Sequence, residues 1–429
     1  MLEYLSIFGG KRLEGSVRVS GAKNSSLPLI IATLLSEGRC ELTNVPNLED
    51  ISVTARLLES LGAEVTYSGN KFVTTTKRIT AAEAPYGLVK MLRASFWVLG
   101  PLLARHGEAR VALPGGDAIG SRPVDLHLKG LVQLGADIRM KNGVVHATAP
   151  GGLTPGKISI DYPSVGATHQ LLMTAALIPG ETILEGAARE PEIVEVADFL
   201  VAMGADIEGA GSPTIRIKGR KSLGGATQEV RGDRIEAATY LIAGAITGGR
   251  VTVKGIQREK LASVLRVLEE AGCTVISADN SISVAADGRL RAFSVTTEPY
   301  PGVATDVQPL LMAAATRAIG RSCVEETVFD NRFGHVADYR RLGADIVLDG
   351  RCAKILGVPM LSGAPVESTD IRAAAGLVLM GLMAEGETEV TELHHLDRGY
   401  EGFIDKLRAL GANISRVPVY EEKELVFGC

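Results

Sequence analysis

The chain has 429 residues, of which 46% are hydrophobic and 22% are charged, and its formal net charge at pH 7 is -5. This composition excludes a disordered chain and is sufficient for more than one buried core. The acidic balance argues against a surface that binds nucleic acid or an anionic membrane, so we expect small-molecule partners. The sequence makes no prediction of the oligomeric state.

The N-terminal residues predict the cellular compartment, and the spacing of the cysteines predicts that no metal is bound. The segment from Met1 to Tyr4 has an early acid, and no apolar stretch there is long enough for a signal or membrane helix, so we expect a cytoplasmic protein. The five cysteines form no C-x-x-C pair and have no histidine at zinc-ligand spacing. We therefore expect reduced thiols and no metal site.

One pattern recurs six times along the chain, in two independent registers. Turns of the type Leu-Gly-Ala recur about 70 residues apart, and apolar helices rich in small residues end at a second series of glycines, each followed by a strand-like segment. The fold is therefore an array of one unit. The two series are Gly62, Gly135, Gly204, Gly272, Gly343 and Gly411, and Gly38, Gly107, Gly180, Gly248, Gly320 and Gly386.

A glycine-rich segment at 112–127 departs from the repeat, and it lies between a predicted strand and a predicted helix. Its glycines leave backbone N–H groups available, and Arg122 can bind a phosphate or carboxylate in bidentate fashion. Asp117 lies where a proton donor could close over a substrate. A solvated turn with a surface salt bridge is the alternative, and the residues alone leave it open.

The fourth copy shows the unit most clearly. Residues 234–246 are apolar almost all round and predict a buried helix, and 250–254 predict a strand. An amphipathic helix over 261–270 and a hairpin of 274–277 with 281–284 follow. The unit is β-α-β-α-β-β, and six copies exceed one core, so we expect an α/β protein of two domains with three copies each.

Charged residues stand at the starts of the apolar helices, where a charge is costly unless it is exposed or paired. If equivalent helix N-termini of the two domains face each other, their partial positive charge and these cations would form an oxyanion site between the domains. N-capping is the alternative for each aspartate, but it does not explain the cations. The residues concerned are Lys23, Arg93, Asp233, Arg234, Asp306, Asp370 and Arg372.

A series of segments, in order from about residue 3 to about residue 416, resembles the UDP-N-acetylglucosamine 1-carboxyvinyltransferase family of enolpyruvyl transferases. The motifs are specific, because they combine the helix starts, the glycine-rich segment and the turns between repeats. They are residues 20–24, 91–97, 114–127, 163–168, 188–192, 233–236, 331–333, 369–373 and 397–400.

The resemblance implies a two-domain inside-out α/β barrel of six β-α-β-α-β-β repeats, with the active site in the cleft. The domains would be residues 22–231, with the catalytic loop, and 1–21 plus 232–429. The implied reaction moves the enolpyruvyl group of phosphoenolpyruvate to the 3-hydroxyl of UDP-N-acetylglucosamine, through a tetrahedral intermediate with loss of phosphate. It is the first committed step of peptidoglycan synthesis and requires no metal or cofactor, so the two substrates are the expected partners.

The family's site residues fall on matching positions of this sequence. Lys23, Arg122 and Arg398 would hold the phosphate of phosphoenolpyruvate. Asp306 would take the proton from the 3-hydroxyl, with Asp370 as a second carboxylate. The remaining contacts to phosphoenolpyruvate would be Asn24, Arg93 and Arg372, and those to the nucleotide sugar Asn24, Arg93, Arg122, Pro123, Val124, Asp125, Leu126, Ser164, Val165, Gly166, Asp306 and Val328.

Asp117 is the main departure from the family, most of whose members have cysteine here as general acid and as the nucleophile that fosfomycin alkylates. A minority carries the same aspartate and remains enzymatic, so we expect Asp117 to be the acid and the enzyme to be insensitive to fosfomycin. An ordinary Asp pKa of about 3.9 leaves only ~0.1% protonated at pH 7. Loop closure and the adjacent phosphate would have to raise that pKa.

Two other functions are weighed against this one. A sister enolpyruvyl transferase that acts on shikimate 3-phosphate shares the architecture, but it would not carry the segments 114–127 and 163–168 in this form. A non-catalytic sensor of UDP-N-acetylglucosamine is favoured only by Asp117. It has no use for the cations that would bind phosphoenolpyruvate.

Overall fold

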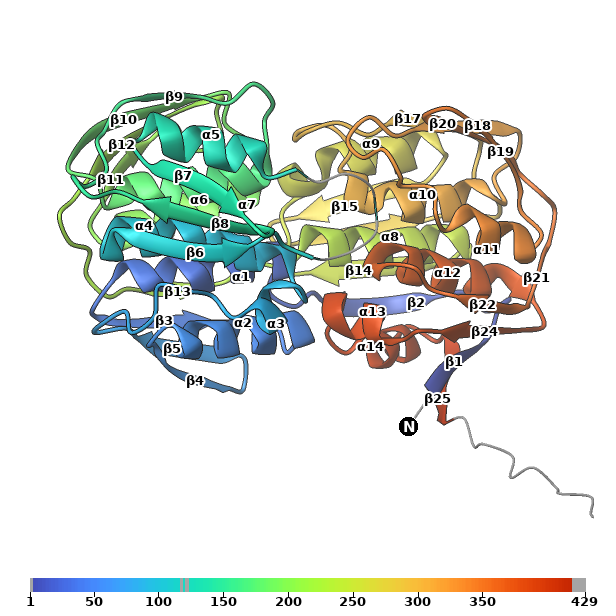
Figure 1. Ribbon diagram of the computed structural model, residues 1–429. Helices are drawn as coiled ribbons and strands as arrows, with labels where there is room; N and C mark the ends of the chain where they lie inside the picture. The colour runs from blue at the N-terminus through green and yellow to red at the C-terminus, as the bar shows by residue number, and fades with distance from the viewer. Residues whose placement is uncertain (1–2, 116–118, 120–122, 419–429) are drawn as a thin grey trace, which may run out of the picture.

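The computed structural model describes residues 3–115, 119 and 123–418, and the residues form two lobes that lie side by side (Figure 1). Within these residues, six sheets of three or four strands and one two-stranded pair are present. Each four-stranded sheet has one parallel pair followed by two antiparallel pairs, as in the order β13-β3-β5-β4. The predicted unit and fold class are confirmed.

The strands of the first lobe belong to the sheets β13-β3-β5-β4, β6-β8-β7 and β11-β12-β10-β9. Their bounds are β3 Arg39–Thr43, β4 Glu64–Ser68, β5 Lys71–Thr75, β6 Glu108–Ala112, β7 Asp137–Lys141, β8 Val144–Thr148, β9 Lys157–Ser159, β10 Gly180–Glu185, β11 Asp206–Glu208, β12 Thr214–Gly219 and β13 Thr227–Glu229.

The strands of the second lobe belong to the sheets β15-β16-β14-β2, β17-β18-β20-β19 and β22-β24-β1-β25, and to the pair β21-β23. Their bounds are β1 Glu3–Phe8, β2 Glu14–Arg18, β14 Arg250–Lys254, β15 Thr274–Ala278, β16 Ser281–Ala285, β17 Ser294–Thr296, β18 Arg321–Glu325, β19 Asp345–Asp349, β20 Cys352–Leu356, β21 Leu361–Ser362, β22 Pro365–Glu367, β23 Ala384–Glu385, β24 Glu387–Thr391 and β25 Asn413–Pro418.

Two kinds of helix alternate along the repeats. The first helix of a repeat is mostly apolar and mostly buried. It lies inside its lobe, with the sheets outside (Figure 1). These helices are α1 Lys23–Ala32, α4 Leu99–His106, α6 Val165–Ala176, α8 Arg234–Ile246, α10 Gln308–Ala315 and α12 Ile371–Met383. The second helices are α2 Glu49–Ser60, α5 Asp125–Gln133, α7 Pro191–Ala202, α9 Ala262–Glu270, α11 Val336–Arg341 and α14 Phe403–Ala409, and the short helices are α3 Tyr86–Val89, α13 His394–Gly399, η1 Thr33–Leu35, η2 Arg93–Val98, η3 Arg258–Leu261 and η4 Thr305–Val307.

Close packing explains why the inner helices are rich in small residues. Every residue of α12 is buried. A Cβ atom at Gly376 would lie 1.9 Å from Tyr339 Oη, which donates a hydrogen bond to the Pro309 carbonyl at 2.9 Å. Helix α9, in contrast, buries one face through Val264 and Leu268 and exposes the other, as its amphipathic sequence predicts.

The hydrophobic core falls into two groups. One contains residues between Leu27 and Val230, and the other contains residues from Leu5 to Val19 together with residues from Ile235 to Ile414. We propose that these groups correspond to two domains, residues 22–231 and residues 1–21 with 232–429.

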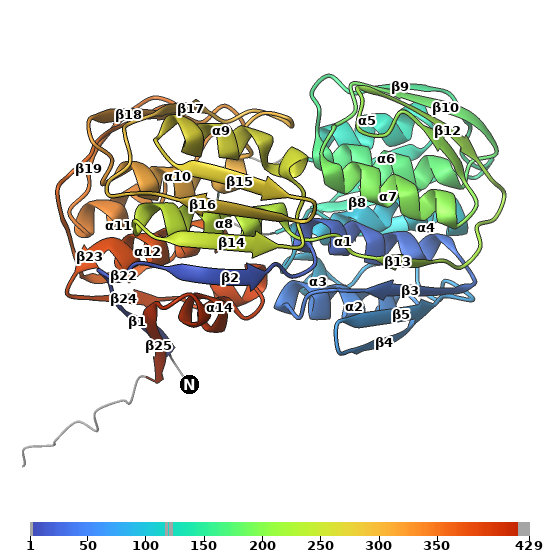
Figure 2. The same cartoon turned by 180° about the vertical axis from the view of Figure 1, so that it is seen from behind.

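The N-terminal strands belong to the second lobe, although the first lobe follows them in sequence. Strand β1 is antiparallel to both β24 and β25, and β2 is parallel to β14, beside which it lies in the view from behind (Figure 2). The chain passes between the lobes at two adjacent places. There Gly21 and Gly232 form an antiparallel bridge, and Ala22 N donates to the Arg231 carbonyl at 2.8 Å.

The expectation of reduced cysteines is wrong for one pair. Cys323 of β18 and Cys352 of β20 form a disulfide between neighbouring strands, whereas Cys40 and Cys273 are buried free thiols. The pairing could not be predicted from the cysteine spacing, because the two cysteines are 29 residues apart and meet only through the sheet. No helix among the described residues is long and apolar enough to cross a bilayer.

Candidate active site

A cavity of about 480 Å³ is lined by residues from both lobes. Asp370 precedes the wall residue Ile371, whereas Asp117 and Arg122 lie outside the described residues. The predicted site residues that line the cavity are Lys23, Asn24, Arg93, Pro123, Val124, Asp125, Leu126, Ser164, Val165, Gly166, Asp306, Val328, Arg372 and Arg398.

Buried helices of both lobes begin at this cavity. The first residues of α1, α6, α8 and α12 all line it, namely Lys23, Val165, Arg234 and Ile371. A helix N-terminus carries partial positive charge, so several of them around one cavity favour an anionic ligand, although side-chain caps already accept from first-turn N–H groups of α6, α8 and α12.

Lys23 and Arg398 are joined by a carboxylate that the sequence analysis did not identify. Lys23 Nζ lies 2.7 Å from Asp50 Oδ2, and Arg398 Nε lies 2.8 Å from Asp50 Oδ1. Burial acts to raise the pKa of Asp50, but the charges of Lys23 and Arg398 outweigh it, so the pKa is lower than its ordinary value. Asp50 is therefore an ionised group between two cations of opposite lobes.

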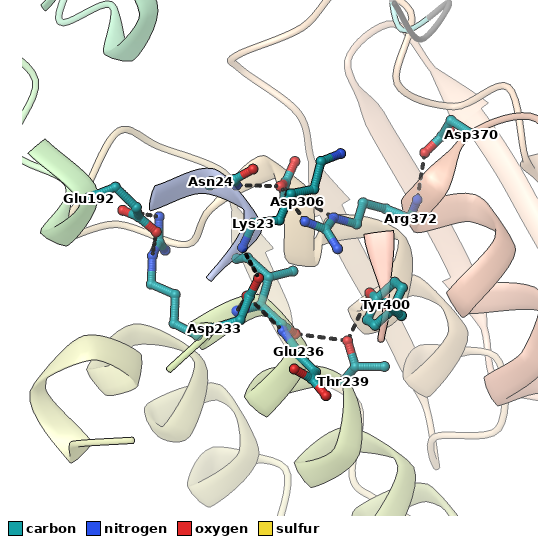
Figure 3. A network of polar contacts seen from close by, with 12 residues as sticks. Lys23, Asn24, Glu192, Asp233, Glu236, Thr239, Asp306, Asp370, Arg372 and Tyr400 are labelled. Carbon is teal, nitrogen blue, oxygen red and sulfur yellow. Dashed lines mark hydrogen bonds and ion pairs between the residues drawn. The ribbon is translucent and has the colours of Figure 1, made fainter. Parts of the chain in front are cut away.

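Asp306 is the centre of a second polar cluster (Figure 3). Arg372 donates to Asp306 Oδ2 from Nη2 at 3.0 Å and from Nε at 3.3 Å, and Asn24 Nδ2 donates to the same oxygen at 3.4 Å. Arg332 Nη2 lies 3.7 Å from Oδ1. Burial acts to raise the pKa of Asp306, but Arg372 and Arg332 outweigh it and hold the pKa well below its ordinary value.

Asp370 and Asp233 are helix N-caps, as the alternative explanation expected. Asp370 Oδ1 accepts hydrogen bonds from the backbone N–H groups of Arg372 at 2.9 Å and Ala373 at 3.1 Å. Asp233 caps α8 in the same way and also accepts from Lys23 N at 3.1 Å. Asp370 additionally lies 3.5 Å from Arg332 Nη1, which connects this cap with the Asp306 cluster.

The segments predicted to bind the nucleotide sugar lie on the first-lobe wall. Ser164 caps α6, where its Oγ accepts from Ala167 N at 3.3 Å, so Val165 and Gly166 form the first turn of that helix. Arg93 Nη2 donates to the Pro123 carbonyl at 3.2 Å and so orders the end of the glycine-rich segment.

Sequence reasoning gave no role to several residues that line the cavity, although Arg234 was among the charged residues at the helix starts. Arg234 Nε lies 2.8 Å from Glu192 Oε1, and this buried ion pair connects the lobes. Asp50 and Arg332 were missed because their partners are distant in sequence. One signal was available for Asp50, which stands at helical spacing with the buried Thr54 and Leu57, on the apolar face of α2.

Carboxylates on the described wall of the cavity are also possible metal ligands. No group of three or more histidine, cysteine, aspartate or glutamate side chains with metal-binding geometry is present in the part of the chain that the structure describes. The ionised carboxylates Asp50 and Asp306 are already paired with lysine and arginine. The described wall of the cavity carries lysine and arginine side chains and carboxylate side chains in equal number, six of each.

Comparison with a family profile decides the family. Residues 7–407 match the profile of EPSP synthase (3-phosphoshikimate 1-carboxyvinyltransferase). The chain belongs to the EPSP synthase family. Like the other members of this family, it is an enolpyruvyl (1-carboxyvinyl) transferase.

Relatives within the EPSP synthase family cover nearly all of the chain. A UDP-N-acetylglucosamine 1-carboxyvinyltransferase of Geobacter metallireducens is 51% identical over 416 residues, which are 97% of this chain and 100% of the relative. UDP-N-acetylglucosamine 1-carboxyvinyltransferase 2 of Carboxydothermus hydrogenoformans is 50% identical over 418 residues, with coverage of 97% and 100%. The resemblance inferred from the sequence motifs is thereby confirmed.

Solved structures of family members have the same fold. The enolpyruvyl transferase NikO from Streptomyces tendae superposes with a TM-score of 0.87 at 29% identity, and covers 97% of this chain and 99% of its own. EPSP synthase from Acinetobacter baumannii gives a TM-score of 0.75 at 21% identity, with coverage of 97% and 100%. The second match supports the fold alone.

Proposed function

We propose that this enzyme transfers the enolpyruvyl group of phosphoenolpyruvate to the 3-hydroxyl of UDP-N-acetylglucosamine. The observation that carries the proposal is the cavity between the lobes, where Lys23, Arg372 and Arg398 accompany helix N-termini in a chain half identical to enzymes named for this activity. Phosphoenolpyruvate carries a phosphate and a carboxylate, so both its ends require cations.

The proposed reaction is an addition followed by an elimination. A proton adds to the methylene carbon of phosphoenolpyruvate while the sugar 3-hydroxyl oxygen bonds to its C2 and loses its own proton. The tetrahedral intermediate then loses phosphate and a methyl proton, which restores the carbon–carbon double bond on the sugar ether. Asp117 is the proposed donor of the first proton, and Asp306 is the proposed acceptor of the hydroxyl proton.

Asp306 requires a change of partners to act as a base. While Arg372 and Arg332 hold it, its lowered pKa makes it a weak proton acceptor. Arg372 is also a proposed ligand of phosphoenolpyruvate. Binding of that anion would give Arg372 a second negatively charged partner and weaken its pairing with Asp306. The pKa of Asp306 would then rise toward the range in which a carboxylate can act as a base.

The remaining proposed roles are those that the family resemblance implies for matching positions. Lys23 and Arg398, with Arg122, hold the phosphate, and Arg93 with Asn24 contacts both substrates. Asp370 is the proposed second carboxylate, and it is connected to Asp306 because Arg332 lies close to both. The proposed nucleotide-sugar contacts are Pro123, Val124, Asp125, Leu126, Ser164, Val165, Gly166 and Val328.

We further propose that the reaction is the first committed step of peptidoglycan synthesis and takes place in the cytoplasm, without a metal or cofactor. The test is phosphate release by the purified protein with phosphoenolpyruvate, with and without UDP-N-acetylglucosamine, and with shikimate 3-phosphate as the control acceptor. Release that depends on the nucleotide sugar and collapses in Asp117→Ala is expected. Release of phosphate with shikimate 3-phosphate but not with UDP-N-acetylglucosamine would contradict the proposed identity of the acceptor. Binding of UDP-N-acetylglucosamine without release of phosphate would indicate that the protein is a non-catalytic sensor of that nucleotide sugar.

A further inference from the structure

Asp50 places a negative charge at the point where two proposed phosphate ligands meet. Its carboxylate lies 2.7 Å from Lys23 Nζ and 2.8 Å from Arg398 Nε, and only 2% of its side chain is exposed. The two cations are also well enclosed, with 9% and 14% of their side chains exposed. The three charges therefore form one buried unit.

The unit joins the two lobes. Lys23 begins α1 and Asp50 belongs to α2 of the first lobe, whereas Arg398 belongs to α13 of the second. Helices α2 and α13 are in contact, so the carboxylate aligns a lysine and an arginine that different core groups position. A lysine and an arginine placed this close would repel each other without an anion between them.

We propose that Asp50 is a positioning residue of the phosphate site, which holds Lys23 and Arg398 together across the lobes and keeps their affinity for released phosphate low. The inference rests on the proposed function, because it takes these two cations as phosphate ligands. A phosphate that reaches them meets the fixed negative charge of Asp50 at short range, in a poorly hydrated site. Phosphate is the leaving group, so weak binding of the free ion favours its departure.

The decisive variant is Asp50→Asn, which keeps the size of the side chain and removes its charge. Inorganic phosphate is titrated by calorimetry into the full-length protein with saturating UDP-N-acetylglucosamine. We expect the Kd for phosphate to fall at least tenfold in Asp50→Asn. We also expect kcat to fall, and inorganic phosphate to become a stronger product inhibitor, while KM for UDP-N-acetylglucosamine stays within about threefold of wild type.

Two further variants separate charge from structure. Asp50→Glu retains the charge and is expected to keep the phosphate Kd within about threefold of wild type. Glu236→Gln is the matched control, because Glu236 is also a buried carboxylate bound to a lysine, Lys406. Burial raises the pKa of Glu236 to about 7, so the titrations are made at about pH 8, where this carboxylate is ionised too. The phosphate Kd of Glu236→Gln should equal that of wild type. If Asp50→Asn does not fold, Asp50→Ser provides the uncharged site.

Phosphate binding that is unchanged or weaker in a folded, uncharged variant would overturn the proposal, as would an Asp50→Glu protein that behaves like Asp50→Asn. A fall in thermal stability with every binding constant altered alike would also overturn it and leave a structural role. The titration does not depend on turnover. Absence of phosphate release by wild type would therefore refute the proposed function, while the effect of Asp50 on phosphate binding would still be measured.

Discussion

Replacement of Asp306 by asparagine tests the proposed base directly. The amide keeps the shape of the side chain and can still accept a hydrogen bond from Arg372, but it cannot take a proton from the substrate. Loss of a positioned general base typically costs 10²–10⁴-fold in rate, so we expect kcat to fall by about that factor. Steady-state phosphate release at saturating substrates measures it.

The same variant has a cost in stability that the structure allows us to work out. Breaking a fully buried ion pair costs about 3–5 kcal/mol. Here 29% of the Asp306 side chain is exposed, and in the variant Arg332 would still have Asp370 as an anionic partner at 3.5 Å. We therefore expect a cost of about 1–2 kcal/mol in the free energy of unfolding. For a domain of some 200 residues this corresponds to a decrease in Tm of roughly 2–8 °C.

The pH dependence of this cost has a defined sign. The pKa of Asp306 is lower in the folded protein than in the unfolded chain, so its ion pairs stabilise the protein at neutral pH and are lost as the pH falls below about 4. The difference in unfolding free energy between wild type and Asp306→Asn should therefore shrink on acidification. Refutation would be a kcat within tenfold of wild type together with the expected decrease in Tm, because Asp306 would then be a structural anion and the base would lie elsewhere.

Four other predictions address the remaining groups. Asparagine is as good an N-cap as aspartate, but Asp370→Asn also removes the charge that buried Arg332 faces at 3.5 Å, so we expect a decrease in Tm of roughly 2–8 °C and a kcat at least tenfold lower; unchanged kcat would leave Asp370 as a cap and ion-pair partner alone. Intact mass should not increase after incubation with UDP-N-acetylglucosamine and fosfomycin, because a carboxylate at position 117 is a poor nucleophile toward an epoxide, whereas Asp117→Cys should gain the mass of one fosfomycin. The basic limb of the kcat–pH profile should shift in Asp117→Cys, since a thiol has a pKa of about 8.5; identical limbs would count against Asp117 as the acid. Burial raises the pKa of Glu236 to about 7 in spite of Lys406, so the folded state binds this proton more tightly than the unfolded chain, and the stability of wild type relative to Glu236→Gln in urea unfolding should fall as the pH rises from about 4.5 to about 7. A difference that rises with pH would contradict that assignment.

The repeat and the site wall could be predicted because both depend on local patterns. Apolar all-round helices, a glycine at each helix end and short paired strands recur in every copy, and each copy specifies the same unit. Charges such as Lys23 and Arg372 at the starts of buried helices indicated a common site, because a charge in an apolar setting needs a partner or a ligand.

What the sequence could not predict depends on docking between distant parts. Asp50 and Arg398 are separated by 348 residues, and Glu192 and Arg234 belong to different lobes. A first-turn acid such as Asp50 is ordinary at a helix start, so its pairing with two cations becomes visible only when α2 meets α13. The disulfide between Cys323 and Cys352 depends in the same way on the register of β18 and β20.

The position of the N-terminal strands has a consequence for synthesis of the protein on the ribosome. Strand β1 ends at Phe8, and its partners begin only at Glu387 and Asn413. At roughly 5–20 residues per second, translation takes about 20–80 s to supply those partners, while residues 22–231 can already bury their own core. Throughout that interval the apolar side chains of β1 lack their native neighbours. A circular permutant that starts at residue 22 and carries residues 1–21 after Pro418 would shorten the wait to a few seconds.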